Sequence, residues 1–401
     1  MIQEFRGSTQ RIGRGWRPIL CISLGFCLAA LLLSCQRPSE SAPQPAAAID
    51  PFAEPVPHSR DADDAGRFLA GMPGTVGSPF RELEDRPAWK LHRRQLDIAW
   101  AGIEEQTIPR MREFQKAELG DAPLEKSVVL YPFSGPDALV LTVFFPQNPT
   151  YVMVALEPPG TLPTPKQLSR QDLVRKLAGV RDTVYSELHR SFFITRQMDR
   201  QFRGQVSDGL LPPILHLLVR TGHTILGHRF VRLDENGLVA GRAEGAPSET
   251  GNRGVELEFR TDADQSVHKL FYYSTNLSDQ RLSQNHPFLT FLSKLNRVTA
   301  FFKATSYMTH KPEFSLIRDQ VLAHGGVVLE DDSGIPYHFF REQSWKVQLY
   351  GAYVRPYGSF KWMQQPDLKQ AYTSSEARPL QFRIGYGFGK IASNLILARK
   401  E

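Results

Sequence analysis

The sequence predicts an α/β or α+β fold in which a mixed, mostly antiparallel sheet is covered by helices, as one large domain or two lobes. Two observations support this fold class. Segments with the apolar spacing of amphipathic helices alternate along the chain with short runs of β-branched and aromatic residues. Such a mixture is typical of layered folds in which helices pack on a sheet.

A third observation separates the N-terminus from this folded part. Residues 1–17 carry four arginines and one acid, and residues 19–33 form an apolar block. That order is typical of an export signal. A helix of this length rises only about 22 Å, against a hydrocarbon core of roughly 30 Å. A cleaved signal over residues 1–34 therefore fits better than its alternative, a permanent signal anchor.

The cysteines indicate how the signal ends. All three lie at or before position 35, and Leu32-Leu33-Ser34-Cys35 resembles the lipobox of bacterial lipoproteins. The resemblance implies that Cys35 is acylated and anchors the protein to a membrane through lipid, palmitate among its chains. If the cell is Gram-negative, Gln36 after the cysteine then implies its outer membrane, facing the periplasm. An ordinary secretory signal cut near residues 46–48 is the alternative.

The segment that follows is predicted to be a tether. Residues 36–66 are rich in proline, alanine and charged residues, a composition that cannot bury enough apolar area to fold. The expected order is signal 1–34, lipidated Cys35 and tether 35–66, and globular extracytoplasmic domain 67–401, with any lobe boundary within 205–254. No cysteine follows Cys35, so the mature chain can form no internal disulfide.

Charge argues against one class of partner. The chain has 48 basic and 42 acidic residues, and removing the four arginines and one glutamate of the signal leaves 44 against 41, a net charge of +3. So small a surplus, outside the cytoplasm, gives no support for nucleic-acid binding.

The elements of the globular part follow in chain order. The helices are expected at 67–71, 87–119 with an interruption at Pro109, 167–200, 212–219, 287–295 and 312–323. The strands are expected at 128–131, 139–145, 151–156, 225–233, 255–260, 267–273, 298–303, 327–329, 346–353, 380–386 and 395–398.

The most suggestive stretch is YPFSGPD, residues 131–137, at the end of a predicted strand. Loops at strand ends often carry ligand-binding residues in α/β proteins. Ser134 is a candidate nucleophile and Asp137 a candidate acid or base, although the Gly-x-Ser-x-Gly elbow is absent. The alternative is a plain turn, because Gly, Pro and Asp favour turn geometry.

Two further strand-end stretches carry acids. LEDDSGIPY contains Glu330, Asp331 and Asp332, and ALEPPG contains Glu157. Carboxylates can act as a general base or bind a hard cation. If these loops meet at one edge of the sheet, they form a carboxylate-lined cleft. The alternative is again a turn with solvated charges.

Aromatic residues gather between Trp345 and Trp362. Exposed rings stack on sugars, so both tryptophans are candidate binding residues for an envelope glycan. Cross-strand aromatic pairs in a buried sheet explain the same residues. The eleven histidines show no HExxH or Cys/His framework, and no cofactor motif is present, so no metal and no cofactor are expected.

YPFSGPD, LEPPG, DDSGIP and the closing RIGYGFG…NLILA resemble exported bacterial proteins without an assigned activity. The resemblance supplies no catalytic residue. The expected function is therefore that of a membrane-anchored lipoprotein that binds an envelope ligand, glycan or protein partner. A cell-envelope hydrolase using Ser134, Asp137, Asp331 or Asp332 is the first alternative, and a structural assembly factor is the second. The sequence leaves open whether the protein is an enzyme.

Overall fold

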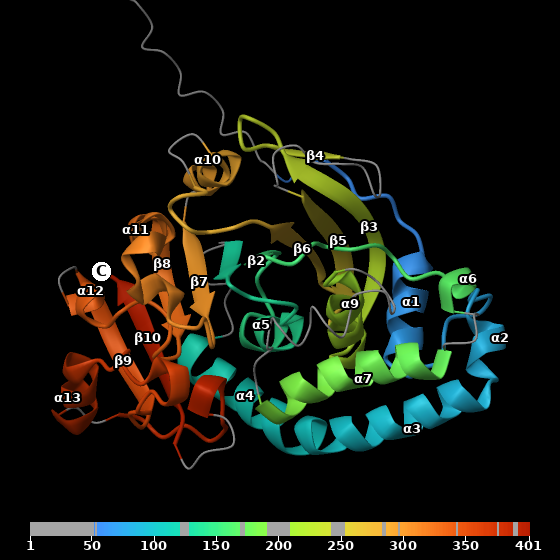
Figure 1. Cartoon of the computed structure of the whole chain (residues 1–401), viewed down its shortest axis with the longest axis horizontal. Helices are drawn as coiled ribbons and strands as arrows, with labels where there is room; N and C mark the ends of the chain where they lie inside the picture. The colour runs from blue at the N-terminus through green and yellow to red at the C-terminus, as the bar shows by residue number, and fades with distance from the viewer. Residues whose placement is uncertain are drawn as a thin grey trace, which may run out of the picture. The chain divides into compact units, whose positions relative to one another are not determined.

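One mixed sheet of ten strands organises the computed structural model of the chain (Figure 1). The structure describes residues 52, 54–120, 128–168, 173–190, 209–241, 253–282, 286–295, 297–341, 344–374, 377–387 and 392–401. The predicted signal, the lipobox and most of the tether lie outside the described residues.

The strands stand in the order β4-β3-β5-β6-β2-β1-β7-β8-β10-β9. Their bounds are β1 Val128–Pro132, β2 Thr150–Ala155, β3 His223–Leu233, β4 Val239–Gly241, β5 Arg253–Thr261, β6 Val267–Ser274, β7 Val298–Phe302, β8 Gly325–Glu330, β9 Trp345–Gly351 and β10 Asn394–Lys400. Five neighbouring pairs are antiparallel and four are parallel, which confirms the predicted mixed, mostly antiparallel sheet. The parallel pairs are contiguous and join β6, β2, β1, β7 and β8 into a central block.

Helices cover both faces of this sheet. Their bounds are α1 Asp61–Leu69, α2 Arg81–Glu84, α3 Pro87–Gly102, α4 Ile108–Phe114, α5 Ala138–Phe144, α6 Pro165–Leu168, α7 Leu173–Arg190, α9 Leu211–Arg220, α10 Pro287–Lys294, α11 Ser315–His324, α12 His338–Arg341 and α13 Pro366–Ser374. The helix α1 begins before residue 67, the expected start of the globular part.

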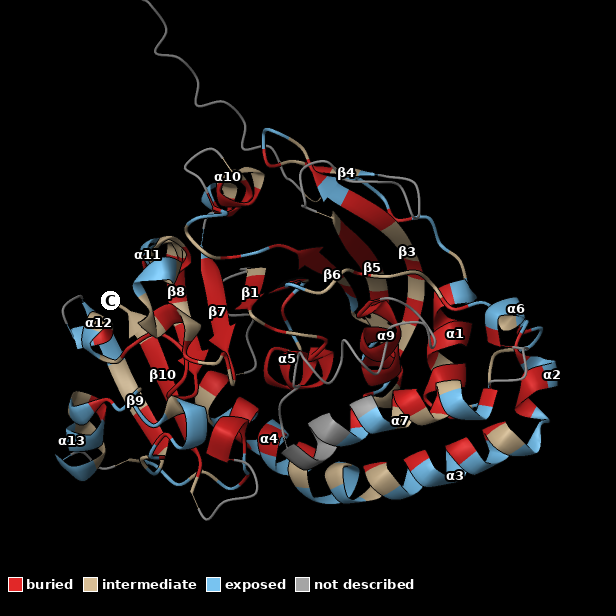
Figure 2. Ribbon diagram, in the orientation of Figure 1, coloured by how far each residue is buried: buried red, intermediate tan, exposed pale blue. Residues whose placement is uncertain are grey.

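Alternate residues of the central strands feed two hydrophobic cores. Val129 and Tyr131 of β1 belong to the core beneath α4, α5 and α9, whereas Leu130 belongs to the core beneath α10 and α11. Such alternation is what a sheet covered on both faces requires. Figure 2 shows the result: the central strands, α5 and α9 are almost wholly buried, while α3 is buried along one side only.

The predicted interruption at Pro109 takes the form of a π-helical turn. Residues 103–107 form that turn between α3 and α4, and Pro109 lies in the first turn of α4. Proline has no N–H to donate and its ring crowds the preceding turn, so a regular α-helix could not continue through it.

Two predicted strands are wrong. Residues 139–145 form the helix α5, whose first amide groups are capped by Asp137: its side chain accepts a hydrogen bond from Val140 N. All seven residues of α5 are buried, so their apolar run shows no helical period. Residues 380–386 form a loop that ends in a short 3-10 turn at Gly385–Gly387, with Gly385 in the left-handed region (φ 61°).

Residues 50–401 form one compact unit. Strands from both sides of the segment 205–254, where the sequence left a lobe boundary possible, pair in the same sheet. Within the described residues, no helix is long and apolar enough to cross a membrane.

Candidate ligand-binding site

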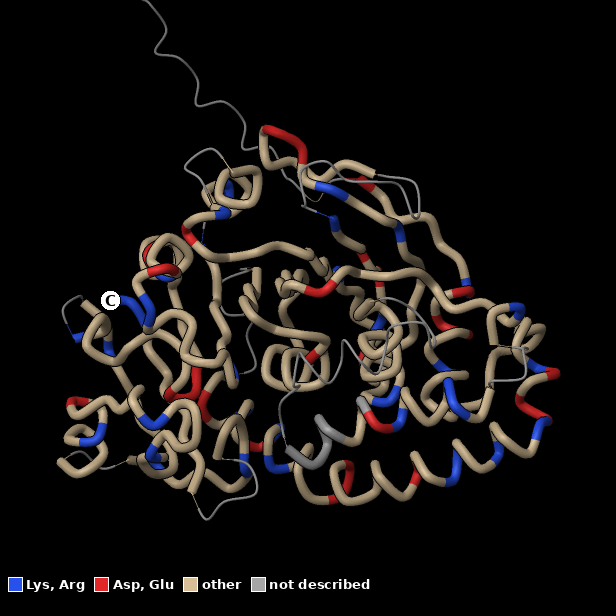
Figure 3. Tube along the Cα trace, in the orientation of Figure 1, with Lys and Arg blue, Asp and Glu red and all other residues tan. Residues whose placement is uncertain are grey.

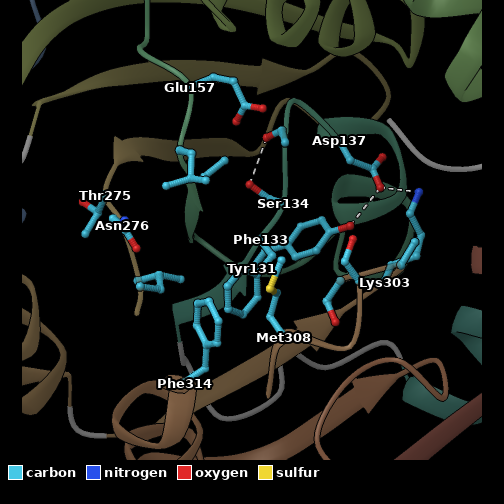
Figure 4. A pocket seen from close by; sticks show the side chains of 17 residues that line it. Tyr131, Phe133, Ser134, Asp137, Glu157, Thr275, Asn276, Lys303, Met308 and Phe314 are labelled. Atoms are coloured by element: carbon cyan, nitrogen blue, oxygen red, sulfur yellow. Dashed lines mark hydrogen bonds and ion pairs between the residues drawn. The ribbon is translucent and has the colours of Figure 1, made fainter. Parts of the chain in front are cut away.

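A pocket of about 150 Å³ opens at the carboxyl ends of the parallel strands (Figure 4). Its walls come from the segments that follow β1, β2, β6 and β7. Because parallel strands end at the same edge of a sheet, four segments far apart in the sequence meet there.

The pocket lies where the direction of chain connection reverses. From β1 the chain passes through α5, on one face of the sheet, to β2. From β7 it passes through α11, on the other face, to β8. Neighbouring strands β1 and β7 therefore send their connections to opposite faces, which leaves a crevice outside their carboxyl ends. Ligands of open α/β sheets bind in such crevices.

One wall of the pocket is apolar. The rings of Phe133 and Phe314 meet edge to face with their centroids 5.7 Å apart. Met308 and Leu156 extend this surface, and Leu156 is 62% exposed although it is a large aliphatic residue. An apolar ligand group that covered these side chains would gain from burial.

Ser134 lies in the pocket wall without a general base. Its hydroxyl donates to the carbonyl of Gly135 at 2.9 Å, with the carbonyl of Val154 at 3.4 Å. Among the described residues, no His, Asp or Glu accepts the Ser134 proton, and a serine nucleophile needs such an acceptor. The geometry gives the predicted nucleophile no activation.

Asp137 is engaged three times. One carboxylate oxygen caps α5, and the other accepts from the hydroxyl of Tyr131 at 3.1 Å and lies 2.5 Å from Nζ of Lys303 (Figure 4). The Asp137 and Lys303 side chains are 1% and 2% exposed. A buried charge without a counter-charge is strongly destabilising, so this ion pair links the end of β1 to the end of β7.

Glu157, after β2, lines the same pocket. Figure 4 shows its carboxylate apart from the Asp137–Lys303 pair. The structure thus brings together Ser134, Asp137 and Glu157, three of the six residues predicted for the strand-end loops.

The other three, Glu330, Asp331 and Asp332, do not line this pocket. Asp331 accepts hydrogen bonds from Ala304 N at 2.8 Å and from the amide and hydroxyl of Ser333 at 3.0 and 2.5 Å. Asp332 accepts from the Tyr307 hydroxyl at 2.6 Å and from the Asn394 amide at 3.1 Å. Both carboxylates are buried, and through Ala304 and Tyr307 they fix the loop that follows β7. Figure 3 colours the acids of the chain red along the Cα trace, and the three at this strand end, Glu330, Asp331 and Asp332, are all buried.

Burial changes the acidity of these carboxyl groups. Loss of water raises the pKa of Asp332 to about 7, and the neighbouring Asp331 charge contributes to that rise. The pKa of Asp331 is also raised, chiefly by burial, and burial holds the pKa of Glu330 well above its usual range. Removal from water disfavours the charged form of each acid.

Unusual backbone conformations concentrate at the pocket. Among the residues that the structure describes, five non-glycine residues have positive φ, and three of them, Phe133, Ala304 and Ser306, line the pocket. Side-chain-bearing residues occupy this region at a cost, which the surrounding hydrogen bonds must offset. Ser306 N, for example, donates to the Tyr386 hydroxyl at 2.9 Å.

The two predicted glycan-stacking residues differ. Trp345 is 8% exposed and its ring meets Phe340 edge to face at 5.5 Å, so it has no open face for a sugar. Trp362 is 79% exposed, and the ammonium of Lys361 lies 4.6 Å from its ring centroid. Neither residue lines the strand-end pocket.

A second hollow, polar and about 400 Å³ in volume, lies between α12, α13 and the edge strand β9. Tyr337, Arg341 and Asp367 are among its lining residues. None of the predicted site residues belongs to it. Within the described residues, no group of three His, Cys, Asp or Glu side chains is arranged to hold a metal ion.

Several residues of the pocket were missed from the sequence. Lys303 follows the apolar strand VTAFF, and Thr275-Asn276 follow FYYS. Their place directly after a buried strand was a signal that they could line a strand-end site. Phe133 and Phe314 are 181 positions apart, and no local pattern indicates that their rings meet.

Comparison of the chain with protein-family models, with curated proteins and with solved structures finds no match.

Proposed function

We propose that this protein is a lipid-anchored cell-envelope protein that binds a small ligand in the strand-end pocket. The observation that carries the proposal is the position of that pocket, outside the carboxyl ends of β1 and β7 where the chain connections diverge. A binding role needs only a shaped cavity with polar and apolar walls. Hydrolysis through Ser134 would need a general base that accepts its proton, and the Ser134 hydroxyl donates to backbone carbonyls instead.

The walls suggest the kind of ligand. A cavity of about 150 Å³ has room for roughly one aromatic ring. Phe133, Phe314 and Leu156 favour an apolar group, while the exposed side chain of Asn276 offers a hydrogen-bonding group. A small amphipathic molecule, or the end of a larger one, matches this combination.

Binding is tested with a library of small amphipathic compounds and ligand-observed NMR. Asn276 is exposed at the pocket wall, so Asn276→Trp should fill the mouth without disturbing the core. Asn236→Trp is the matched control, because Asn236 is also exposed but lies in the turn between β3 and β4. Hits lost in Asn276→Trp and kept in Asn236→Trp support the proposal. Hits kept in both variants, or no hits at all, contradict it.

Anchoring is tested at the lipobox. Cys35→Ala should abolish labelling by a fatty-acid analogue and release the protein from membranes. Cys21→Ala and Cys27→Ala are matched controls, since both thiols lie within the predicted signal and should leave with it. Labelling that persists in Cys35→Ala would refute the lipid anchor. Attachment at the outer membrane, facing the periplasm, is part of the same proposal.

A further inference from the structure

An exposed loop rich in aromatic and basic residues lies beside the pocket. The 355–363 loop, residues Arg355 to Met363, contains two basic residues and no acid. Trp362 is 79% exposed and Tyr357 is 50% exposed, although both are large amphipathic side chains. The other tryptophans after Cys35, at 89, 100 and 345, are 4%, 0% and 8% exposed.

A short 3-10 turn in the middle of this loop, Gly358–Phe360, packs against the fold. The ring of Phe360 lies 5.2 Å from that of Tyr307 and 5.2 Å from that of Tyr386. The Tyr386 hydroxyl in turn donates to the carbonyl of Ala304, a residue of the pocket wall, at 3.0 Å. The loop is therefore coupled through two packed rings to the segment that lines the pocket.

We propose that the 355–363 loop rests on the surface of the bilayer to which the protein is anchored. This inference depends on the lipid anchor of the proposed function. Tryptophan and tyrosine favour the membrane–water interface because one end of each ring is apolar and the other polar. Arg355 and Lys361 add attraction to anionic head groups, so binding should strengthen as the share of anionic lipid rises.

The length of the tether makes a second contact necessary if the pocket is to have a fixed orientation. Seventeen residue steps separate Cys35 from Phe52. Fully extended, they span at most about 60 Å. A folded unit of this size has a radius of gyration of about 20 Å, so the tether alone lets any face of it meet the membrane. A contact by the 355–363 loop would hold the pocket close to the bilayer.

The fluorescence of Trp362 can report contact between the 355–363 loop and the bilayer. The acylated mature protein is reconstituted in vesicles of phosphatidylcholine with phosphatidylglycerol, whose acyl chains are brominated in one sample and unmodified in the other. Bromine quenches tryptophan only at short range, and the other tryptophans after Cys35 are buried in the fold. Bromine should remove only the part of the tryptophan emission that comes from Trp362, and the emission of Trp362→Phe should not change.

Charge reversal separates a bilayer contact from adventitious exposure. Lys361→Glu should reduce the quenching, and the reduction should be larger in vesicles with more phosphatidylglycerol. Lys369→Glu is the matched control, because Lys369 is exposed on α13 outside the loop. Equal quenching in the two charge variants would overturn the proposal.

Three further outcomes would refute the loop contact or the anchor. Vesicle-bound protein whose emission is unchanged by bromine refutes the loop contact and leaves the anchor intact. Protein that does not float with vesicles at all refutes the anchor itself, so the two failures are distinguishable. A change in Trp362 emission with soluble peptidoglycan fragments, without quenching by brominated lipid, would assign the loop to a glycan instead and overturn the proposal.

Discussion

The loops after β1 and β8 resemble each other in sequence but have different surroundings. SGPD, residues 134–137, and DDSG, residues 331–334, each combine serine, glycine and acid at the end of a buried strand. The first borders a pocket, and the second is buried with its carboxylates bonded internally.

The position of each strand in the sheet explains the difference. The strand β1 has parallel neighbours on both sides and lies where the connections diverge, so space remains beyond its end. The strand β8 pairs with antiparallel β10, which begins where β8 ends. Asn394, the first residue of β10, therefore bonds Asp332, and Gly385 packs so closely on Asp331 that a Cβ would collide with its carboxylate. Topology, rather than residue type, decides which loop is open.

The largest effect is expected from breaking the buried ion pair of the open loop. Lys303→Met leaves the Asp137 carboxylate buried without its cation and should cost about 3–5 kcal/mol in the free energy of unfolding. The double variant Lys303→Met/Asp137→Asn should recover part of that loss, since no uncompensated charge remains. Urea titrations measure both, and a loss below about 1 kcal/mol in the single variant would show that the pair is solvated rather than buried.

The closed loop should make stability depend on pH. The folded protein keeps the Asp332 proton up to about pH 7, whereas an aspartate in water ordinarily has a pKa of 3.8. At this carboxyl the folded state binds more protons in this window, so Asp332 contributes a fall in stability as pH rises from about 4 to about 7. Burial lowers the pKa of several histidines, and these act in the opposite direction: His92, His216, His223, His268, His286 and His310.

Asp332→Asn removes this contribution, so the stability of the wild type relative to the variant should fall across this range. Asp331 and Glu330, whose pKa values are raised in the same direction, act in both proteins. Urea midpoints followed by near-UV circular dichroism across this range provide the measurement. Parallel curves for the wild type and Asp332→Asn would show that Asp332 titrates normally.

A smaller effect is expected at Ser134. Ser134→Ala removes a hydroxyl that donates only to backbone carbonyls and should cost about 1 kcal/mol. Ligand binding should weaken little, because the pocket walls persist. If Ser134→Ala instead abolished an esterase or glycosidase activity with its melting temperature unchanged, Ser134 would be a nucleophile after all.

The smallest effect is expected at Trp362. Trp362→Ala should change the free energy of unfolding by less than about 0.5 kcal/mol, because this side chain is 79% exposed. Thermal unfolding of the soluble domain tests this. A loss of several kcal/mol would mean that the ring is packed rather than exposed.

The sequence predicted the fold better than the site. The strands at 128–131 and 298–303 could be predicted because β-branched and aromatic residues cluster there. The helix α5 was missed because it is buried on every side and has no polar face. Ser134, Asp137 and Glu157 were found by their place after strands, but their meeting with Lys303 and Phe314 depends on strand order, which no local pattern encodes.

The most direct test of the pocket is a crystal structure of the protein soaked with the best compound from the NMR screen. The account predicts that the compound lies against Phe133, Leu156 and Phe314, at the carboxyl ends of β1 and β7. A compound seated instead in the polar hollow of Tyr337, Arg341 and Asp367, with the strand-end pocket empty, would contradict it.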